Sequence, residues 1–147
     1  MYFVGSPQIR WPADAFSGHP IPADARDFLM NIGLPEFFDW FTYEFGVYDS
    51  EGPDLVIGEN SGYPVFIDSS SGAVFAQDEP DTRRWFLNSS VELLSRFLHL
   101  ISEFQRVPDD TAGKDGAFTQ MRQEMIRLDS PALSDPSKCV WACWIDQ

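Results

Sequence analysis

Apolar residues recur along this chain with two different periods, one typical of helices and one typical of strands. The helical period comes first and predicts a helix over residues 22–32. Its apolar positions are Ala25, Phe28, Leu29 and Ile32. Pro22 suits the first turn, and Gly33 suits the left-handed residue that ends such a helix. The Pro-, Gly- and Ala-rich residues 5–22 before it predict an extended lead-in.

The middle of the chain changes to the alternation of short strands separated by turn residues. Phe41, Tyr43 and Phe45 alternate with polar residues, which predicts a half-buried strand. Further strands are predicted at residues 55–57, ending at Gly58, and at residues 63–67, 73–76 and 84–87. Turn residues fill 60–62 and 68–72. Because loops this short join the strands, their pairing is expected to be mostly antiparallel.

The clearest predicted element is a long helix from about residue 90 to Pro108. Ser89 followed by Glu92 has the spacing of a capping box, so Ser89 is expected to cap it. The predicted apolar face consists of Val91, Leu94, Phe97, Leu98, Ile101 and Phe104. The opposite stripe carries Glu92, Arg96, His99, Glu103 and Arg106. We expect the apolar face to pack on the sheet through Phe66 and Phe86.

The last part of the chain predicts a loop at residues 109–116, a helix at about 116–129 and a short closing helix within 137–147. A helix, several antiparallel strands and then further helices define an α+β fold, with a mainly antiparallel sheet backed by helices. The length of 147 residues suits a single domain. We divide residues 1–147 into a lead-in (1–21), a core (22–107) and C-terminal helices (108–147).

Composition agrees with a folded domain, because 44% of the residues are hydrophobic and 15% are aromatic. No apolar run approaches the roughly 20 residues that a membrane span needs. The first residues have neither the basic flank nor the apolar segment of a secretory signal. We therefore expect a cytoplasmic protein without membrane contacts, and a monomer.

The formal net charge of −13 is concentrated in one part of the chain. Residues 1–82 hold 14 acidic residues against Arg10 and Arg26, whereas residues 83–147 hold 9 acidic and 8 basic residues. A surface this negative repels phosphate backbones, so nucleic-acid binding is disfavoured. It complements a basic protein partner, although acidity also serves solubility alone.

The sequence lacks the motifs of common catalytic and cofactor sites. It has no glycine-rich dinucleotide or phosphate loop and no Gly-x-Ser-x-Gly or Ser-x-x-Lys arrangement. His19 and His99 are far apart, and Cys139 and Cys143 have no nearby histidine to complete a zinc site. We expect no catalytic residue, no metal site and no cofactor, and two reduced, partly buried thiols.

Acidic and aromatic residues between positions 36 and 81 leave more than one interpretation open. Residues 49–54 form the densest acidic group, which fits a solvated loop, part of a partner-binding face or a metal site, but lacks calcium-loop spacing. Residues 78–81 have the same alternatives. The run 37–40 is Phe-Phe-Asp-Trp, and its side chains cannot all point inward from one strand. Phe38 or Trp40 is therefore a candidate exposed anchor for a partner.

Several segments, in their order and spacing, resemble a known family. They are Gly33-Leu34-Pro35 after a helix, residues 55–58, residues 65–68 with 72–74, and Phe86-Leu87-Asn88-Ser89-Ser90 before the long helix. This succession over residues 24–104 resembles the fourth subgroup of the SUKH superfamily of bacterial immunity proteins. The resemblance implies an α+β fold and a non-enzymatic protein that neutralises a polymorphic toxin, often a nuclease or a nucleic-acid deaminase. It supplies no binding residues, because these vary within the superfamily.

The sequence and the resemblance together give the hypothesis that an acidic face binds a basic toxin domain. The candidate binding residues are Glu36, Asp39, Trp40, Glu44, Asp49, Glu51, Asp54, Glu59, Asp78, Glu79 and Asp81. One alternative is an intracellular scaffold or regulatory binding protein of the same superfamily. A carboxylate-based hydrolase is another, and a buried, close pair of acidic side chains in a concave pocket would favour it.

Overall fold

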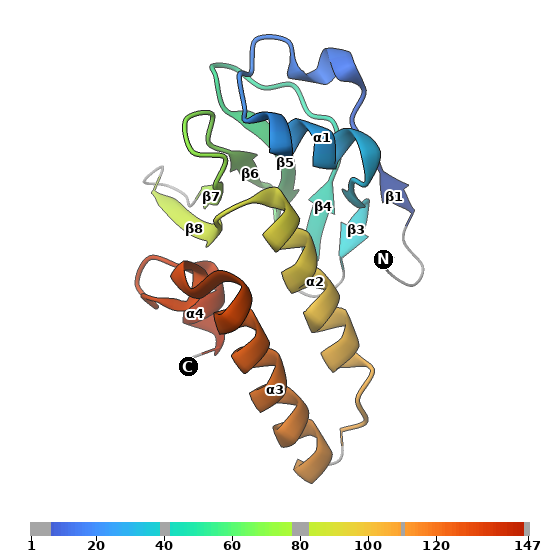
Figure 1. Ribbon diagram of the computed structural model, residues 1–147, viewed down its shortest axis with the longest axis vertical. Coiled ribbons are helices and arrows are strands. Elements are labelled where there is room, and N and C mark those ends of the chain that lie inside the picture. The colour runs from blue at the N-terminus through green and yellow to red at the C-terminus, as the bar shows by residue number, and fades with distance from the viewer. Residues whose placement is uncertain (1–6, 39–41, 78–82, 110, 146–147) are drawn as a thin grey trace.

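An antiparallel sheet with helices on one side forms the protein (Figure 1). The computed structural model describes residues 7–38, 42–77, 83–109 and 111–145. The elements are, in chain order, β1 (Gln8–Ile9), η1 (Ala13–Phe16), α1 (Ala23–Asn31), β2 (Leu34–Pro35), β3 (Phe37–Phe38), β4 (Tyr43–Phe45), β5 (Leu55–Asn60), β6 (Tyr63–Ile67), β7 (Val74–Gln77), β8 (Arg84–Asn88), α2 (Val91–Gln105), α3 (Thr111–Asp129), η3 (Ser130–Leu133) and α4 (Val140–Ile145). This is the α+β fold that the sequence predicts.

The six strands of the main sheet lie in chain order, from β3 at one edge to β8 at the other. Every neighbouring pair is antiparallel, which confirms the pairing expected from the short loops. β1 and β2 form a separate antiparallel ladder. A parallel bridge between Phe86 and Cys139 extends the sheet beyond β8.

A β-bulge in β5 decides which side chains of this strand reach each face of the sheet. Val56 lies opposite Phe66, whereas Gly58 lies opposite Val65, so β5 has one additional residue at this point. The bulge restarts the alternation, and Glu59 therefore shares a face with Val56 despite their odd spacing.

The prediction that this strand ends at Gly58 is wrong, because β5 continues to Asn60. Gly58 serves close packing instead. A Cβ atom added there would lie 2.5 Å from the Glu44 carbonyl oxygen and 2.8 Å from a ring carbon of Phe45. Glycine is thus required for β5 to approach β4, which brings Glu59 opposite Glu44.

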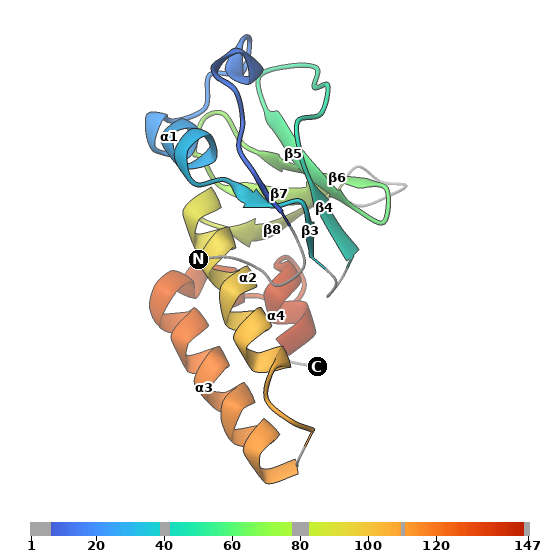
Figure 2. The same cartoon turned by 90° about the vertical axis from the view of Figure 1, so that its right-hand side faces the viewer.

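The core lies between the sheet and the helices (Figure 2). Trp141 of α4 is fully buried, with its ring centroid 6.1 Å from that of Phe97 on α2 and 6.2 Å from that of Tyr43 on β4. The predicted apolar face of α2 is buried at every position: Val91, Leu94, Phe97, Leu98, Ile101 and Phe104. Cys139 is buried and Cys143 partly buried, and both are free thiols, as expected.

Phe66 does not contribute to the contact between α2 and the sheet, contrary to the prediction. Val65 and Ile67 are fully buried in the core, so alternation along β6 sends Phe66 to the opposite face. There its ring centroid lies 6.1 Å from that of Phe75, and Phe86 continues the row with its centroid 5.6 Å from that of Phe75.

Helix α1 follows the predicted boundaries closely. Pro22 is its N-cap residue, and Gly33 adopts a φ of +81° where the chain leaves the helix. The backbone N–H of Gly33 donates to the carbonyl oxygen of Phe28 at 2.8 Å. Ile32, predicted to be part of the apolar stripe, is 47% exposed because it lies beyond the last helical residue.

Helices α2 and α3 form a long pair that extends away from the sheet (Figures 1 and 2). The prediction of a loop over residues 109–116 is wrong, since α3 begins at Thr111. Lys114 lies within this first part of α3, and its Nζ donates to the carbonyl oxygens of Phe104 and Val107 at 3.0 and 2.9 Å. A lysine that caps the carboxyl end of one helix holds the start of the next helix against it, despite the nearby glycines.

Ser90 is the N-cap residue of α2, so the prediction that Ser89 caps this helix is wrong by one position. The Ser90 hydroxyl accepts a hydrogen bond from the backbone N–H of Leu93 at 3.2 Å. Ser89 instead donates its hydroxyl to Asp129 at the end of α3, at 2.6 Å. In the ranges that the structure describes, none of the helices combines the length and apolar character needed to cross a membrane.

Candidate functional site

One face of the sheet is turned away from the helices (Figure 2). The strand register places a row of acidic and aromatic side chains on this face. Cross-strand register aligns Phe37, Glu44 and Glu59 across β3, β4 and β5. On the other half of the same face, Phe66, Phe75 and Phe86 align across β6, β7 and β8. We call this surface the open face and define it by Phe37, Glu44, Val56, Glu59, Phe66, Phe75, Arg84 and Phe86.

Arg84 occupies the phenylalanine half of the open face. Its guanidinium carbon lies 4.7 Å from the ring centroid of Phe66 and 4.8 Å from that of Phe75. The same guanidinium is 3.1 Å from a carboxylate oxygen of Asp54 and 3.5 Å from one of Asp68. Arginine commonly binds over aromatic rings while its N–H groups bind carboxylates.

Asp68 also organises the turn between β6 and β7. The hydroxyl groups of Ser70 and Ser71 donate to its carboxylate at 2.7 and 2.8 Å. These hydrogen bonds, with a smaller contribution from the charge of Arg84, lower the pKa of Asp68. Asp54 accepts a further bond from the backbone N–H of Ser69 at 2.8 Å. Both carboxylates are therefore engaged within the protein.

The other half of the open face contains a hollow of about 280 Å³ at the edge of the sheet. Its lining residues are Glu36, Phe37, Glu44, Phe45 and Tyr48. Phe37 is 41% exposed, and Glu36 and Glu44 are exposed. The hollow thus combines aromatic walls with carboxylates that solvent reaches.

Two carboxylates of like charge lie side by side next to this hollow. Glu44 and Glu59 are directly opposite each other in the antiparallel pair β4–β5. In such a pair the Cβ atoms are about 4.5–5.5 Å apart, and like charges at this position destabilise the sheet. Partial burial raises the pKa of Tyr48, and the charges of Glu59 and Glu44 raise it further. The negative potential therefore extends over the hollow.

The structure brings part of the predicted acidic set together and separates the rest. Glu36 and Glu44 line the hollow and Glu59 lies opposite Glu44 on the adjacent strand, while Asp49 and Glu51 are exposed in the loop between β4 and β5. The ion pair with Arg84 engages Asp54. The remaining candidates lie outside the described residues: Asp39, Trp40, Asp78, Glu79 and Asp81.

Phe37 and Tyr48 are features of the hollow that the sequence interpretation missed. Phe38, a candidate anchor, is 4% exposed and belongs to the core, and its neighbour Phe37 is the exposed residue. Phe37 lies on the open face because it is paired across the strands with the exposed Glu44. Strict alternation back from the buried Tyr43 would place Phe37, rather than Phe38, on the buried face, so the sequence pattern alone does not reveal it.

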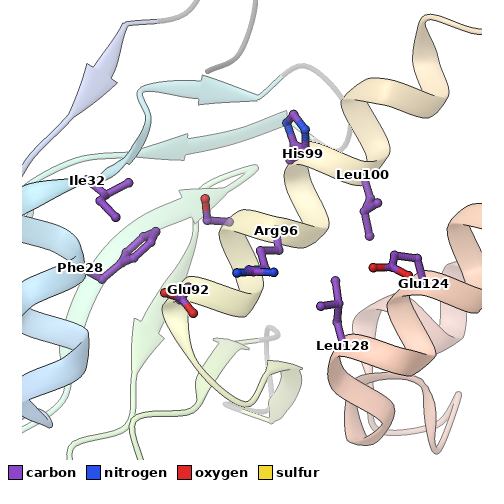
Figure 3. Close-up of a pocket in the computed structure, with 9 residues that line it drawn as sticks. Phe28, Ile32, Glu92, Arg96, His99, Leu100, Glu124 and Leu128 are labelled. Carbon is purple, nitrogen blue, oxygen red and sulfur yellow. The ribbon is translucent and has the colours of Figure 1, made fainter. Parts of the chain in front are cut away.

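A second hollow, of about 460 Å³, lies on the helical side between α1, α2 and α3 (Figure 3). Its lining residues are Phe28, Ile32, Glu92, Ser95, Arg96, His99, Leu100, Glu124 and Leu128. It mixes apolar walls with charges of both signs, and Figure 3 shows them on three different helices. This composition favours no single class of ligand.

Ser95, His99 and Glu103 follow one another at intervals of one helical turn along α2, yet they do not form a catalytic triad. His99 Nε2 lies 3.6 Å from a carboxylate oxygen of Glu103. However, neither the Ser95 hydroxyl nor His99 Nδ1 has a hydrogen-bond partner, so the base does not contact the hydroxyl.

The positions of the carboxylates bear on two alternatives that the sequence leaves open, a hydrolase and a metal site. Asp129 is the buried acidic residue of the described ranges, and it bonds to Asn88 and Ser89 rather than to a second carboxylate. A hydrolase with two carboxylates requires a close, buried pair, whereas the close pair of Glu44 and Glu59 lies on the open face, with Glu44 exposed. In the part of the chain that the structure describes, no group of three His, Cys, Asp or Glu side chains could hold a metal ion.

Aromatic side chains and arginine, which the open face combines, are enriched at protein–protein interfaces. The family model described as SUKH-4 immunity protein matches residues 4–147, nearly the whole chain. The chain therefore belongs to the SUKH-4 immunity protein family, and this confirms the resemblance seen in its sequence. Searches of curated proteins and of solved structures found no match.

Proposed function

We propose that this protein binds a basic toxin domain and neutralises it by occlusion, without catalysing a reaction. The observation that carries the proposal is the match to an immunity-protein family over residues 4–147. The acidity of residues 1–82, with 14 acidic residues against two arginines, supports a basic partner. Toxins that act on nucleic acids, such as nucleases and deaminases, need positive surface to bind phosphate backbones.

The binding face in this proposal consists of the acidic residues within positions 36–81 together with the open face of the sheet, which also includes Arg84 and Phe86. Charged residues at the rim of an interface accelerate association, and an inhibitor that must act quickly benefits from such steering. The protein acts as a monomer in the cytoplasm, where it meets a toxin before nucleic acid does. It does not bind nucleic acid itself.

The test is co-expression in bacteria with the toxin encoded beside this protein, scored by survival. We expect full protection and a stable one-to-one complex by size-exclusion chromatography with light scattering. Cells that die despite soluble, folded protein, together with no complex between the purified partners, would contradict the immunity function.

A further inference from the structure

The open face contains one complete arginine-binding arrangement, formed within the chain. Arg84 lies over the rings of Phe66 and Phe75, at 4.7 and 4.8 Å, and its charge is neutralised by Asp54 and Asp68 at 3.1 and 3.5 Å. The neighbouring half of the same face presents similar groups. There, aromatic rings and carboxylates also meet on adjacent strands, in the hollow lined by Glu36, Phe37, Glu44, Phe45 and Tyr48.

The two halves of the open face differ in whether a cation of the chain pairs with their carboxylates. Among the described residues, neither Glu44 nor Glu59 forms an ion pair, although they lie opposite each other in the sheet. No lysine or arginine occurs in residues 27–82, so nearby segments of the chain supply none. The arrangement retains unfavourable charge repulsion in the free protein, which a cation from outside would remove.

We propose that this hollow receives an arginine side chain of the toxin, with the guanidinium against Phe37 and Tyr48 and bonded to Glu44 and Glu59. This inference rests on the proposed immunity function. The chain uses the same contacts for Arg84, two rings and two carboxylates, on the same face of the sheet. Raised by burial and by both carboxylates, the pKa of Tyr48 reports the negative potential that attracts the cation.

Arginine fits this site better than lysine for two reasons. Its planar guanidinium stacks on aromatic rings, and its five N–H donors reach two carboxylates at once. Lysine provides a compact, strongly hydrated ammonium group that loses more hydration on entry. A volume of about 280 Å³ accommodates one side chain rather than a folded segment, so the hollow holds a single anchor within a larger interface.

The proposal predicts opposite effects on stability and on binding. Glu44→Gln and Glu59→Gln, singly and together, should raise the melting temperature of the free protein by about 1–3 °C, because they remove the repulsion. The double variant should raise the Kd for the toxin by about tenfold or more, or about 1.4 kcal/mol, mainly through faster dissociation. Glu92→Gln is the matched control on the helical side: it should leave the Kd unchanged and lower the melting temperature slightly rather than raise it, because Glu92 lies in the first turn of α2.

A probe that does not depend on the toxin tests the ligand chemistry directly. Nα-acetyl-arginine methylamide should shift the NMR signals of the Phe37 and Tyr48 rings, and the corresponding lysine compound should shift them less. The neutral norleucine compound and the double variant define the background. Equal shifts with all three compounds would overturn the proposal.

These experiments test the arginine site and the immunity function separately. If wild-type protein protects cells but the double variant binds the toxin with unchanged Kd, the arginine anchor is wrong and the immunity function stands. If the wild-type protein gives no protection, the immunity function itself fails, whatever the probe shows. The raised melting temperature of the glutamine variants verifies that they fold.

Discussion

At the scale of single residues, the buried carboxylate of Asp129 connects three segments that are distant in sequence. It accepts hydrogen bonds from the Asn88 side chain at 3.1 Å and from the Ser89 backbone N–H at 2.8 Å. Asn88 in turn accepts a bond from Trp141 Nε1 at 2.9 Å. The network therefore ties the start of α2 to the end of α3 and to α4.

Asp129→Ala should destabilise the protein by about 3 kcal/mol, since buried donors lose a charged acceptor and remain unsatisfied. Denaturant unfolding monitored by tryptophan fluorescence measures this difference. Asp135→Ala is the control, because Asp135 also accepts from a neighbouring backbone N–H and a hydroxyl, those of Ser137, but at the surface. Equal losses for the two variants would show that burial of the network is unimportant.

At the scale of elements, the sequence predicts most helices and strands, and the failures have physical causes. Local spacing locates α1, the strands β4 to β8 and the buried face of α2, because each depends on a regular period, whereas the two-residue strands β1, β2 and β3 are too short to show one. The start of α3 depends on contacts of Lys114 with α2, which no local pattern contains. The bulge in β5 depends on how closely Gly58 allows β4 to approach.

The end of α1 offers a test of such a close approach. Gly33 and Gly18 both have a φ of +81°, but an added Cβ at Gly33 would lie 1.8 Å from the carbonyl oxygen of Ile9, whereas Gly18 has open space. Gly18→Ala should cost about 1–2 kcal/mol through the left-handed backbone alone. Gly33→Ala should cost clearly more and displace β1 from β2, measured by thermal unfolding and by amide exchange at Ile9. Similar losses of stability for both variants would indicate that β1 moves away from Gly33 without destabilising the protein.

At the scale of the whole molecule, the acidic part of the chain and the charge-balanced part form different elements of the fold. Residues 1–82, which hold 14 of the acidic residues, form α1 and the strands from β1 to β7, whereas residues 83–147 form β8 and the helices α2, α3 and α4. This uneven distribution is visible in the sequence, and so are Glu36, Glu44 and Glu59 as candidates. The sequence does not show that Glu36 and Glu44 line a hollow with Phe37 and Tyr48, or that Glu59 lies opposite Glu44, because strand register and the bulge in β5 decide both.

The position of the negative charge, and not only its amount, should govern association with the toxin. Asp49→Lys with Glu51→Lys, and Asp27→Lys with Asp115→Lys, change the net charge equally, and all four residues are exposed. The first pair lies in the loop between β4 and β5, and the second lies on α1 and α3. Because exposed charges act over a Debye length of about 8–10 Å, the first pair should slow association more, especially at low salt. Stopped-flow kinetics at two salt concentrations measure this difference, and equal slowing by both pairs would place the binding face elsewhere.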